Sequence, residues 1–250
     1  GSPGGEDQAA AGTIPEKDDP ALLKKLVDGR RLWFDELSGA VRSAAVPGPY
    51  ISAGGLAGLA GEIAAGSTAA SLDGEPAAVV PGGGIAFGSA FHDIMEQVEL
   101  ENPAPGRLAG LADRTAGHWG IGDSGELIRL VRATLEHPLI ARARQARLLL
   151  RELPFIYELD DLLVEGIIDL LFQEGEGLVI VDYKTDLVTP DELERRWAGY
   201  RRQGMVYALA MAGITGLPVR EISFLFVREG LVKSLLNPDL AALREALRKT

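Results

Sequence analysis

Two aspartates and a lysine lie in apolar segments that are separated by a short stretch rich in glutamate and glycine. Asp169 belongs to the first segment, and Asp182 and Lys184 belong to the second. Glycine at the first central position favours a type II′ turn, so Gly175 and Glu176 predict a two-residue β-hairpin. That hairpin would place Asp169 directly opposite Asp182, with Cβ atoms roughly 4.5–5.5 Å apart.

This arrangement predicts a site for a divalent cation. Two carboxylates that face each other in apolar strands repel, and each is costly to bury without a partner. A cation held by hard oxygen ligands would remove that cost. Lys184 lies two residues beyond Asp182 and therefore projects from the same face of its strand. The alternative is a surface hairpin that carries only an Asp–Lys ion pair.

A metal beside two carboxylates and an ammonium group is suited to the hydrolysis of a phosphodiester. The metal would polarise the phosphate and lower the pKa of a bound water molecule. Lys184 would orient that water molecule or offset the negative charge that develops.

The hydrophobic patterns predict a helical first half and a second half of strands and helices. Predicted helices cover 20–44, 85–100, 106–118, 124–136, 190–212 and 238–248, and predicted strands cover 155–159, 162–172, 178–183, 222–227 and 231–235. The helix from Pro190 has the clearest ends, because Thr189 and Glu192 have capping-box spacing and Gly213 suits a C-terminal cap. This order of elements predicts a mixed α/β fold with a helical N-terminal half.

The chain divides into three predicted parts. Residues 1–18 are predicted to be a disordered tail, in which Gly1-Ser2 resembles a tag remnant, and the missing initiator Met suggests an excised fragment. Residues 19–84 are predicted to be a lead-in of helices and loops. Residues 85–250 are predicted to form the catalytic core.

Composition narrows the possible functions. The chain of 250 residues contains no cysteine, which excludes disulfides, thiolate zinc sites and cysteine-ligated iron–sulfur clusters. The lack of cysteine also fits a cytoplasmic location, which we expect. No apolar run is long enough to cross a bilayer, so we expect a soluble protein with no membrane partner. The net charge of −11 argues against a broad nucleic-acid surface, so any contact with DNA must be local.

Arginines gather in two places that could supply such local contacts. The two groups are Arg142, Arg144, Arg147 and Arg151, and Arg195, Arg196, Arg201 and Arg202. Each group is explained equally well as the solvated face of a helix.

These residues resemble the PD-(D/E)XK nuclease superfamily, and in particular its RecB/AddA-type branch. The matching segments are 88–92, 152–155, 166–169 and 181–186, followed by Gln203 and Tyr207. Their order and spacing agree with that branch over about residues 85–230, and residues 49–53 are loosely similar to the lead-in of AddA-type nuclease domains. The resemblance implies a restriction-endonuclease-like mixed β-sheet that is flanked by helices.

The resemblance also implies a role for each matching residue. Asp169, Asp182 and Lys184 would be the catalytic residues. The metal would be bound by Asp169, Asp182, the imidazole of His92 and the backbone carbonyl of Tyr183. Outside this resemblance, a lone helical histidine is more commonly a structural residue.

Gln203 and Tyr207 would contact DNA or form the wall of the active site. They are four residues apart and therefore share one face of a helix. The same spacing also suits simple packing of that helix on the sheet, and the two explanations are equally good.

The implied function is divalent-metal-dependent hydrolysis of DNA, with exonuclease action on single-stranded ends. Domains of this branch lie C-terminal to a UvrD-like helicase. The implied partners are therefore DNA, a helicase motor in the same polypeptide and a second helicase–nuclease subunit, with a role in double-strand break repair and recombination. The implied cofactor is Mg²⁺ or Mn²⁺ without an iron–sulfur cluster.

Two other functions remain open. One is a catalytically inactive nuclease-fold module that binds DNA or serves in subunit docking. Such relatives usually lose an aspartate or the lysine, whereas this chain keeps the full set. The other is a stand-alone defence nuclease.

Overall fold

The computed structural model describes residues 50–52, 84–101, 103–159 and 162–248. The predicted tail at 1–18 lies outside these residues, as does nearly all of the predicted lead-in at 19–84 with its helix at 20–44. The fold that positions the candidate site is therefore built from the segments that follow Gly84, together with one short strand at 50–52.

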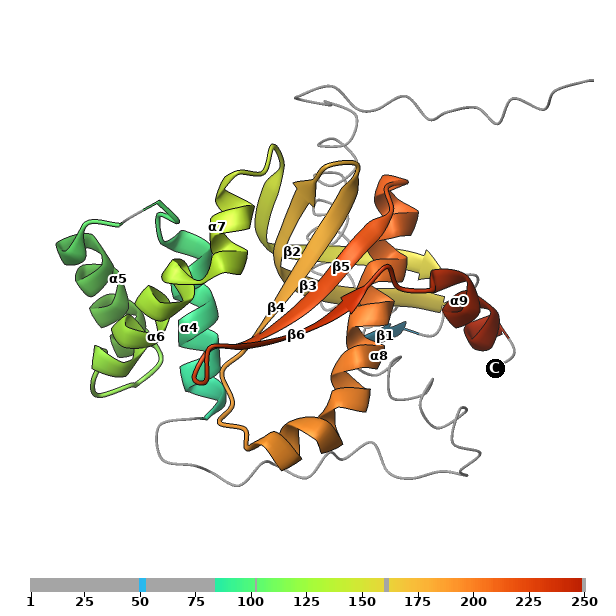
Figure 1. Ribbon diagram of the computed structural model, residues 1–250. Coiled ribbons are helices and arrows are strands. Elements are labelled where there is room, and N and C mark those ends of the chain that lie inside the picture. Colours follow the sequence, from blue (N-terminus) through green and yellow to red (C-terminus); the bar gives the residue numbers. More distant parts are fainter. Residues whose placement is uncertain (1–49, 53–83, 102, 160–161, 249–250) are drawn as a thin grey trace, which may run out of the picture.

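A six-stranded mixed β-sheet forms the centre of the described structure (Figure 1). Its strands are β1 (Tyr50–Ser52), β2 (Leu149–Leu159), β3 (Leu162–Glu174), β4 (Gly177–Lys184), β5 (Val219–Phe226) and β6 (Leu231–Leu236). The order is β1-β3-β4-β5-β6. Strand β2 pairs with the edge of β3 that lies opposite to β4. The β1–β3 and β4–β5 pairs are parallel and the others are antiparallel, so the predicted mixed α/β fold class is confirmed.

Helices lie on either side of this sheet (Figure 1). They are α4 (Ile85–Gln97), α5 (Pro105–His118), α6 (Gly125–Glu136), α7 (Pro138–Arg144), α8 (Pro190–Thr215) and α9 (Leu240–Arg248). Helix α7 was not predicted. Pro138 ends α6 and at once begins α7, because proline suits the first position of a helix. Among the described helices, none has the length and apolar character that a membrane span requires.

The sheet buries apolar side chains on both faces, and this creates two cores. The α8-side core includes Ile168, Leu171, Ile180, Phe224, Tyr207 and Met211. The α4-side core includes Leu170, Phe172, Val181, Phe91, Ile94 and Leu130. Burial on both faces explains why the central strands read as continuous apolar runs rather than as an alternating pattern.

Strands β3 and β4 form the predicted hairpin. Gly175 has a φ of 60°, as the first central position of a type II′ turn requires, and the ladder extends from this turn to the pair Leu170–Val181. Beyond that pair β4 leaves β3 and continues beside β5. Asp169 and Asp182 occupy the next position along their strands, where the two strands diverge. We call this place the fork.

Helix α8 begins as predicted but ends later. The hydroxyl of Thr189 accepts a hydrogen bond from the N–H of Glu192 at 3.3 Å, and the Glu192 carboxylate accepts one from the N–H of Thr189 at 2.9 Å. The predicted cap at Gly213 is wrong, because the helix continues to Gly216, whose φ is 76°. Gly213 instead allows close packing, since a Cβ there would clash with the ring of Tyr157.

Candidate active site

Helix α4 brings His92 to the fork. Phe91 and Ile94 are fully buried in the α4-side core and fix the helix on the sheet. Gly88 lies one turn before His92, and a Cβ there would be only 3.1 Å from the hydroxyl oxygen of Thr185. The small residue therefore allows α4 to pack closely against the end of β4.

His92 forms a polar cluster with two carboxylates. Its Nδ1 lies 3.0 Å from Oε1 of Glu152 and 3.5 Å from Oδ1 of Asp169. Burial would lower the pKa of His92, but Asp169 and Glu152 outweigh burial and raise the pKa to about 9. At neutral pH the imidazole therefore carries a proton that balances part of the acidic charge.

Glu152 has a backbone conformation that is rare for a residue with a side chain. Its φ is 43°, in the left-handed region, which costs roughly 1–2 kcal/mol outside glycine. Its neighbours Arg151 and Leu153 are paired with β3, whereas Glu152 is not. The Arg151 guanidinium donates to the carbonyl oxygens of Met95 and Val98 at 2.9 and 2.6 Å. The strained residue thus lies where β2 holds the C-terminal end of α4.

The regular alternation of side chains also breaks on β3, opposite Glu152. Ile168 and Leu171 both pack in the α8-side core, although residues three apart on a regular strand face opposite sides. Leu170 packs in the α4-side core. The break falls at Asp169, and the carboxylates of Glu152 and Asp169 both reach the imidazole on α4.

Asp169 is buried and connects the two strands of the fork. Its Oδ2 accepts a hydrogen bond of 2.6 Å from the backbone N–H of Tyr183 on β4. Burial and the nearby Asp182 raise the pKa of Asp169 well above its usual range, while His92 opposes that rise. A carboxyl group in such a place is stabilised as the anion by a nearby cation.

Asp182 and Lys184 form a buried ion pair on β4. Nζ of Lys184 lies 2.7 Å from Oδ2 of Asp182, and their side chains are only 17% and 6% exposed. The same ammonium donates to Oε1 of Gln203 at 3.2 Å. Burial would lower the pKa of Lys184, but Asp182 more than offsets this effect and raises it. Lys184 is therefore a charged amine held in a fixed place.

Gln203 and Tyr207 extend this polar group along α8. Nε2 of Gln203 donates to the Tyr207 hydroxyl at 3.1 Å, and the Tyr207 ring packs edge-on against Phe155 at 5.8 Å. Burial raises the pKa of Tyr207, so its hydroxyl keeps its proton. Gly166 makes this packing possible, because a Cβ there would lie 2.8 Å from Phe155 and 3.1 Å from Tyr207.

The structure thus places the predicted side chains around the fork, but on either side of the sheet. The predicted direct pairing of Asp169 with Asp182 across the hairpin is wrong, because the β3–β4 ladder ends at Leu170 and Val181. His92 and Asp169 contact each other on the α4 side. Lys184 joins Asp182 to Gln203 on the α8 side. The role of each residue, and of the Tyr183 carbonyl as a ligand, stays a prediction.

Glu152 is a candidate that was missed from the sequence, where it matched only the start of a strand. The available signal was a charged pair, Arg151 and Glu152, between two apolar runs. Among the described residues, His92, Glu152 and Asp169 are the one group of three whose ligand-type atoms all lie within 4.8 Å of one another. Two carboxylates and an imidazole fit a hard divalent cation, and burial together with the nearby Asp182 raises the pKa of one of these carboxyl groups, Asp169.

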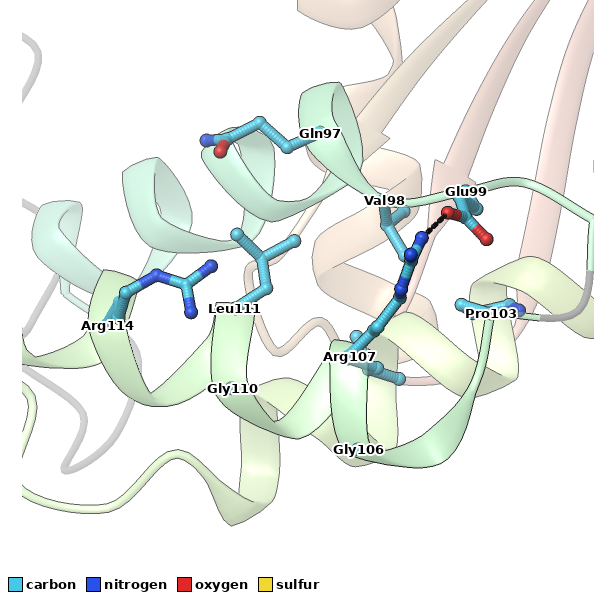
Figure 2. Close-up of a pocket in the computed structure, with 10 residues that line it drawn as sticks. Gln97, Val98, Glu99, Pro103, Gly106, Arg107, Gly110, Leu111 and Arg114 are labelled. Atoms are coloured by element: carbon cyan, nitrogen blue, oxygen red, sulfur yellow. Dashed lines mark hydrogen bonds and ion pairs between the residues drawn. The ribbon is translucent and has the colours of Figure 1, made fainter.

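A cavity elsewhere in the molecule does not include these residues. It has a volume of about 380 Å³ and lies between the end of α4 and α5, where Arg107 pairs with Glu99 (Figure 2). None of its lining residues belongs to the fork. The candidate site is therefore identified by its polar side chains rather than by this cavity.

Comparison with known protein families agrees with the geometry at the fork. The family model of the PD-(D/E)XK nuclease superfamily matches residues 71–250. The chain belongs to this superfamily. The matched segment contains both sides of the fork and the helices that support them.

Several relatives that match parts of the chain are named as one subunit of an ATP-dependent helicase/nuclease. The protein of Carboxydothermus hydrogenoformans is 29% identical over 178 residues, which are 63% of this chain and 15% of the relative. The protein of Moorella thermoacetica is 30% identical over 168 residues, which are 58% of this chain and 12% of the relative. The protein of Thermoanaerobacter sp. (strain X514) is 41% identical over 76 residues, 30% of this chain and 6% of the relative. The chain thus spans only a small part of the length of these relatives.

Proposed function

We propose that this PD-(D/E)XK domain is a divalent-metal-dependent nuclease that hydrolyses phosphodiester bonds in DNA. The observation that carries the proposal is the convergence of His92, Glu152 and Asp169 within 4.8 Å, beside the buried ion pair of Asp182 and Lys184. Three carboxylates share one amine and one imidazole. A buried excess of acid is costly without a further cation, so the charges favour a metal site over a purely structural network.

In the proposed site, Mg²⁺ or Mn²⁺ would be held by His92, Asp169, Asp182 and the backbone carbonyl of Tyr183. Glu152 adds a carboxylate that was not expected from the sequence. A bound ion would polarise the scissile phosphate and lower the pKa of a water molecule. His92 must release its proton before its ring nitrogen can act as a ligand, so binding would depend on pH.

Lys184 would supply positive charge at a fixed place beside the phosphate. Its ammonium is already oriented by Asp182 and Gln203. A donor that is positioned in advance, in a site with little water, stabilises charge that develops on a phosphate oxygen or orients the attacking water molecule. Gln203 and Tyr207 would contact DNA or form the wall on this side.

The proposed setting is a helicase–nuclease that acts in double-strand break repair and recombination. The names of the relatives support this setting, because each includes a helicase and a nuclease. We propose that a helicase motor in the same polypeptide delivers single-stranded ends to this domain, that the domain degrades them as an exonuclease, and that a second helicase–nuclease subunit takes part.

A cleavage assay tests the proposal. Single-stranded oligonucleotides labelled at the 5′ or 3′ end are incubated with Mg²⁺, Mn²⁺ or EDTA. The wild-type protein is compared with Asp182→Ala and with Glu174→Ala. Glu174 is a matched control, because its carboxylate also forms an ion pair, with Arg142 at 2.8 Å, but at the turn of the hairpin.

We expect cleavage by the wild type and by Glu174→Ala, loss of cleavage in EDTA, and a fall of about 100–1,000-fold in Asp182→Ala. Equal lack of cleavage by the wild type and Asp182→Ala, with intact DNA binding, would instead support the inactive binding module. Release of short products from one end indicates an exonuclease, and internal fragments indicate an endonuclease.

A further inference from the structure

The ammonium group of Lys184 also lies over an aromatic surface. Nζ is 5.0 Å from the centroid of the Tyr200 ring and 5.7 Å from that of Phe224. A cation within about 6 Å of a ring is attracted to its electron-rich face, and the attraction grows when water is excluded. Lys184 therefore has the Asp182 carboxylate on one side and aromatic rings on another.

Tyr200 is held firmly against the sheet. Its ring packs against Phe224 and Phe226, with centroid distances of 5.7 and 5.6 Å. In the β4–β5 ladder these two phenylalanines are the partners of Asp182 and Lys184. The ring therefore rests on the residues directly beside the buried ion pair.

The hydroxyl end of Tyr200 and the helix that carries it are anchored as well. Arg196 is hydrogen-bonded to Tyr200, and the guanidinium of Arg196 lies 3.7 Å from the carboxylate of Asp186. Gly204 brings α8 close to β5, because a Cβ there would lie 3.0 Å from the Phe224 ring. Ring, hydroxyl and helix are thus all restrained before any ligand binds.

We propose that Tyr200 is a positioning residue for Lys184, whose ring holds the ammonium in the place where it serves the cleavage reaction. A lysine side chain has a flexible four-carbon stem, and holding its ammonium in one place costs rotamer entropy. Asp182 and Gln203 fix the ammonium from two sides, and the Tyr200 ring closes a third. The consequence for cleavage rests on the proposed nuclease function, whereas the contact between ring and ammonium does not.

The chain contains a matched contact one turn earlier on α8. Nζ of Lys233 lies 5.1 Å from the centroid of the Trp197 ring, and Trp197 also packs against Phe224, at 5.8 Å. Lys233 pairs with Glu194 rather than with a carboxylate of the fork. Trp197→Leu therefore removes an aromatic ring that packs against the same Phe224. The lysine that loses its ring contact is then Lys233 and not Lys184.

Chemical labelling tests the contact without added metal or DNA. Lysine acetylation rates are measured by mass spectrometry in the wild type, Tyr200→Leu, Tyr200→Phe and Trp197→Leu. We expect Tyr200→Leu to raise the rate at Lys184 several-fold and to leave Lys233 unchanged. Trp197→Leu should do the reverse, and Tyr200→Phe should match the wild type. Equal rates at Lys184 in Tyr200→Leu and Tyr200→Phe would overturn the proposal.

Cleavage kinetics test the positioning role. We expect Tyr200→Leu to lower kcat about tenfold, with KM and metal affinity within about twofold of the wild type. Tyr200→Phe should restore the rate, and Tyr200→Leu should cause no further loss in a Lys184→Ala background. An equal loss of rate and of Tm in Trp197→Leu would show a general packing effect and overturn the proposal. If the wild type itself fails to cleave, the proposed function is wrong, and the labelling result still decides the role of Tyr200.

Discussion

Each side of the fork combines acidic and basic groups, but the two sides arrange them differently. On the α4 side, an imidazole and two carboxylates crowd together, and the pKa values of His92 and Asp169 are both raised. On the α8 side, the amine of Lys184 is already paired with Asp182 and surrounded by an amide and rings. On the α4 side the carboxylates outnumber the cationic groups, whereas on the α8 side one carboxylate is paired with one ammonium group.

The two sides are therefore suited to different functions. The α4 side is suited to take up a cation, and the α8 side is suited to hold a fixed ammonium. The two sides belong to different helices, and the hydrogen bond from Tyr183 to Asp169 joins the two strands at the fork. Substitution of His92 should therefore change metal affinity, and substitution of Lys184 should change the rate at saturating metal. Asp182 is both a proposed ligand and the partner of Lys184, so its substitution should change both.

The largest effect is expected from Lys184→Ala. Removal of a positioned donor should lower the cleavage rate by about 100–1,000-fold at saturating metal. Affinity for Mn²⁺, measured by calorimetry, should stay within a few-fold of the wild type, since the amine is not a ligand. A parallel loss of metal affinity would show that the two sides are not separate.

The converse change is His92→Ala on the α4 side. We expect Mn²⁺ affinity to fall about 10–100-fold, the range that applies when groups around a metal are removed. Cleavage should recover in part at high metal concentration, which Lys184→Ala should not allow. His118→Ala on α5 is the control, because that histidine is exposed and lies in no cluster of metal-ligating groups among the described residues.

Two glycines provide a smaller and purely steric comparison. Gly166→Ala on the α8 side should lower the free energy of unfolding by about 1–3 kcal/mol, because the new Cβ overlaps the rings of Phe155 and Tyr207. Gly88→Ala on the α4 side should change it by less than about 1 kcal/mol, since the hydroxyl of Thr185 can move and alanine favours a helix. Urea denaturation measures both. A larger effect at Gly88 would contradict this account of the packing.

The last comparison concerns pH, through the imidazole on the α4 side. The pKa of His92 is raised from 6.5 to about 9 in the folded protein, so the folded state holds this proton more tightly than the unfolded state. The stability that it contributes is complete below pH 6.5 and is lost as the pH rises toward 9. The raised pKa of Asp169 acts in the same direction.

Without added metal, Tm should therefore fall by about 2–6 °C between roughly pH 6.5 and 8.5. The gain in Tm on addition of Mg²⁺ should grow over the same interval, because binding must displace the proton of His92. Differential scanning calorimetry measures both trends, and His92→Ala should flatten them. A Tm that rises with pH would contradict the assignment of a raised pKa.

The sequence predicted those features that depend on local patterns. The turn at Gly175 set the β3–β4 register correctly up to Leu170 and Val181, because a two-residue turn leaves no freedom in pairing. Thr189 and Glu192 correctly marked the start of α8. The order of helices and strands from α4 onward followed from periodicity and chain breakers, apart from the short helix α7.

Features that depend on tertiary contacts were not predictable in the same way. Gly213 had the residue type of a helix cap, but its role is to make room for Tyr157, which is distant in sequence. Glu152 was missed because its part in the cluster requires a left-handed backbone and a break in the facing strand. A pattern of alternation presumes a regular strand, and it fails where the strand bends to bring carboxylates together.

The hydrogen bond between Tyr183 and Asp169 gives this carboxylate a structural part as well as a chemical one. Where β4 turns away from β3, the amide of residue 183 no longer finds a carbonyl on the neighbouring strand, and a carboxylate accepts its hydrogen bond instead. Alanine at position 169 would remove that acceptor and leave a buried N–H unsatisfied, at a cost of about 1–3 kcal/mol. Asparagine keeps an acceptor oxygen, so it separates the chemistry of this carboxylate from its part in the backbone.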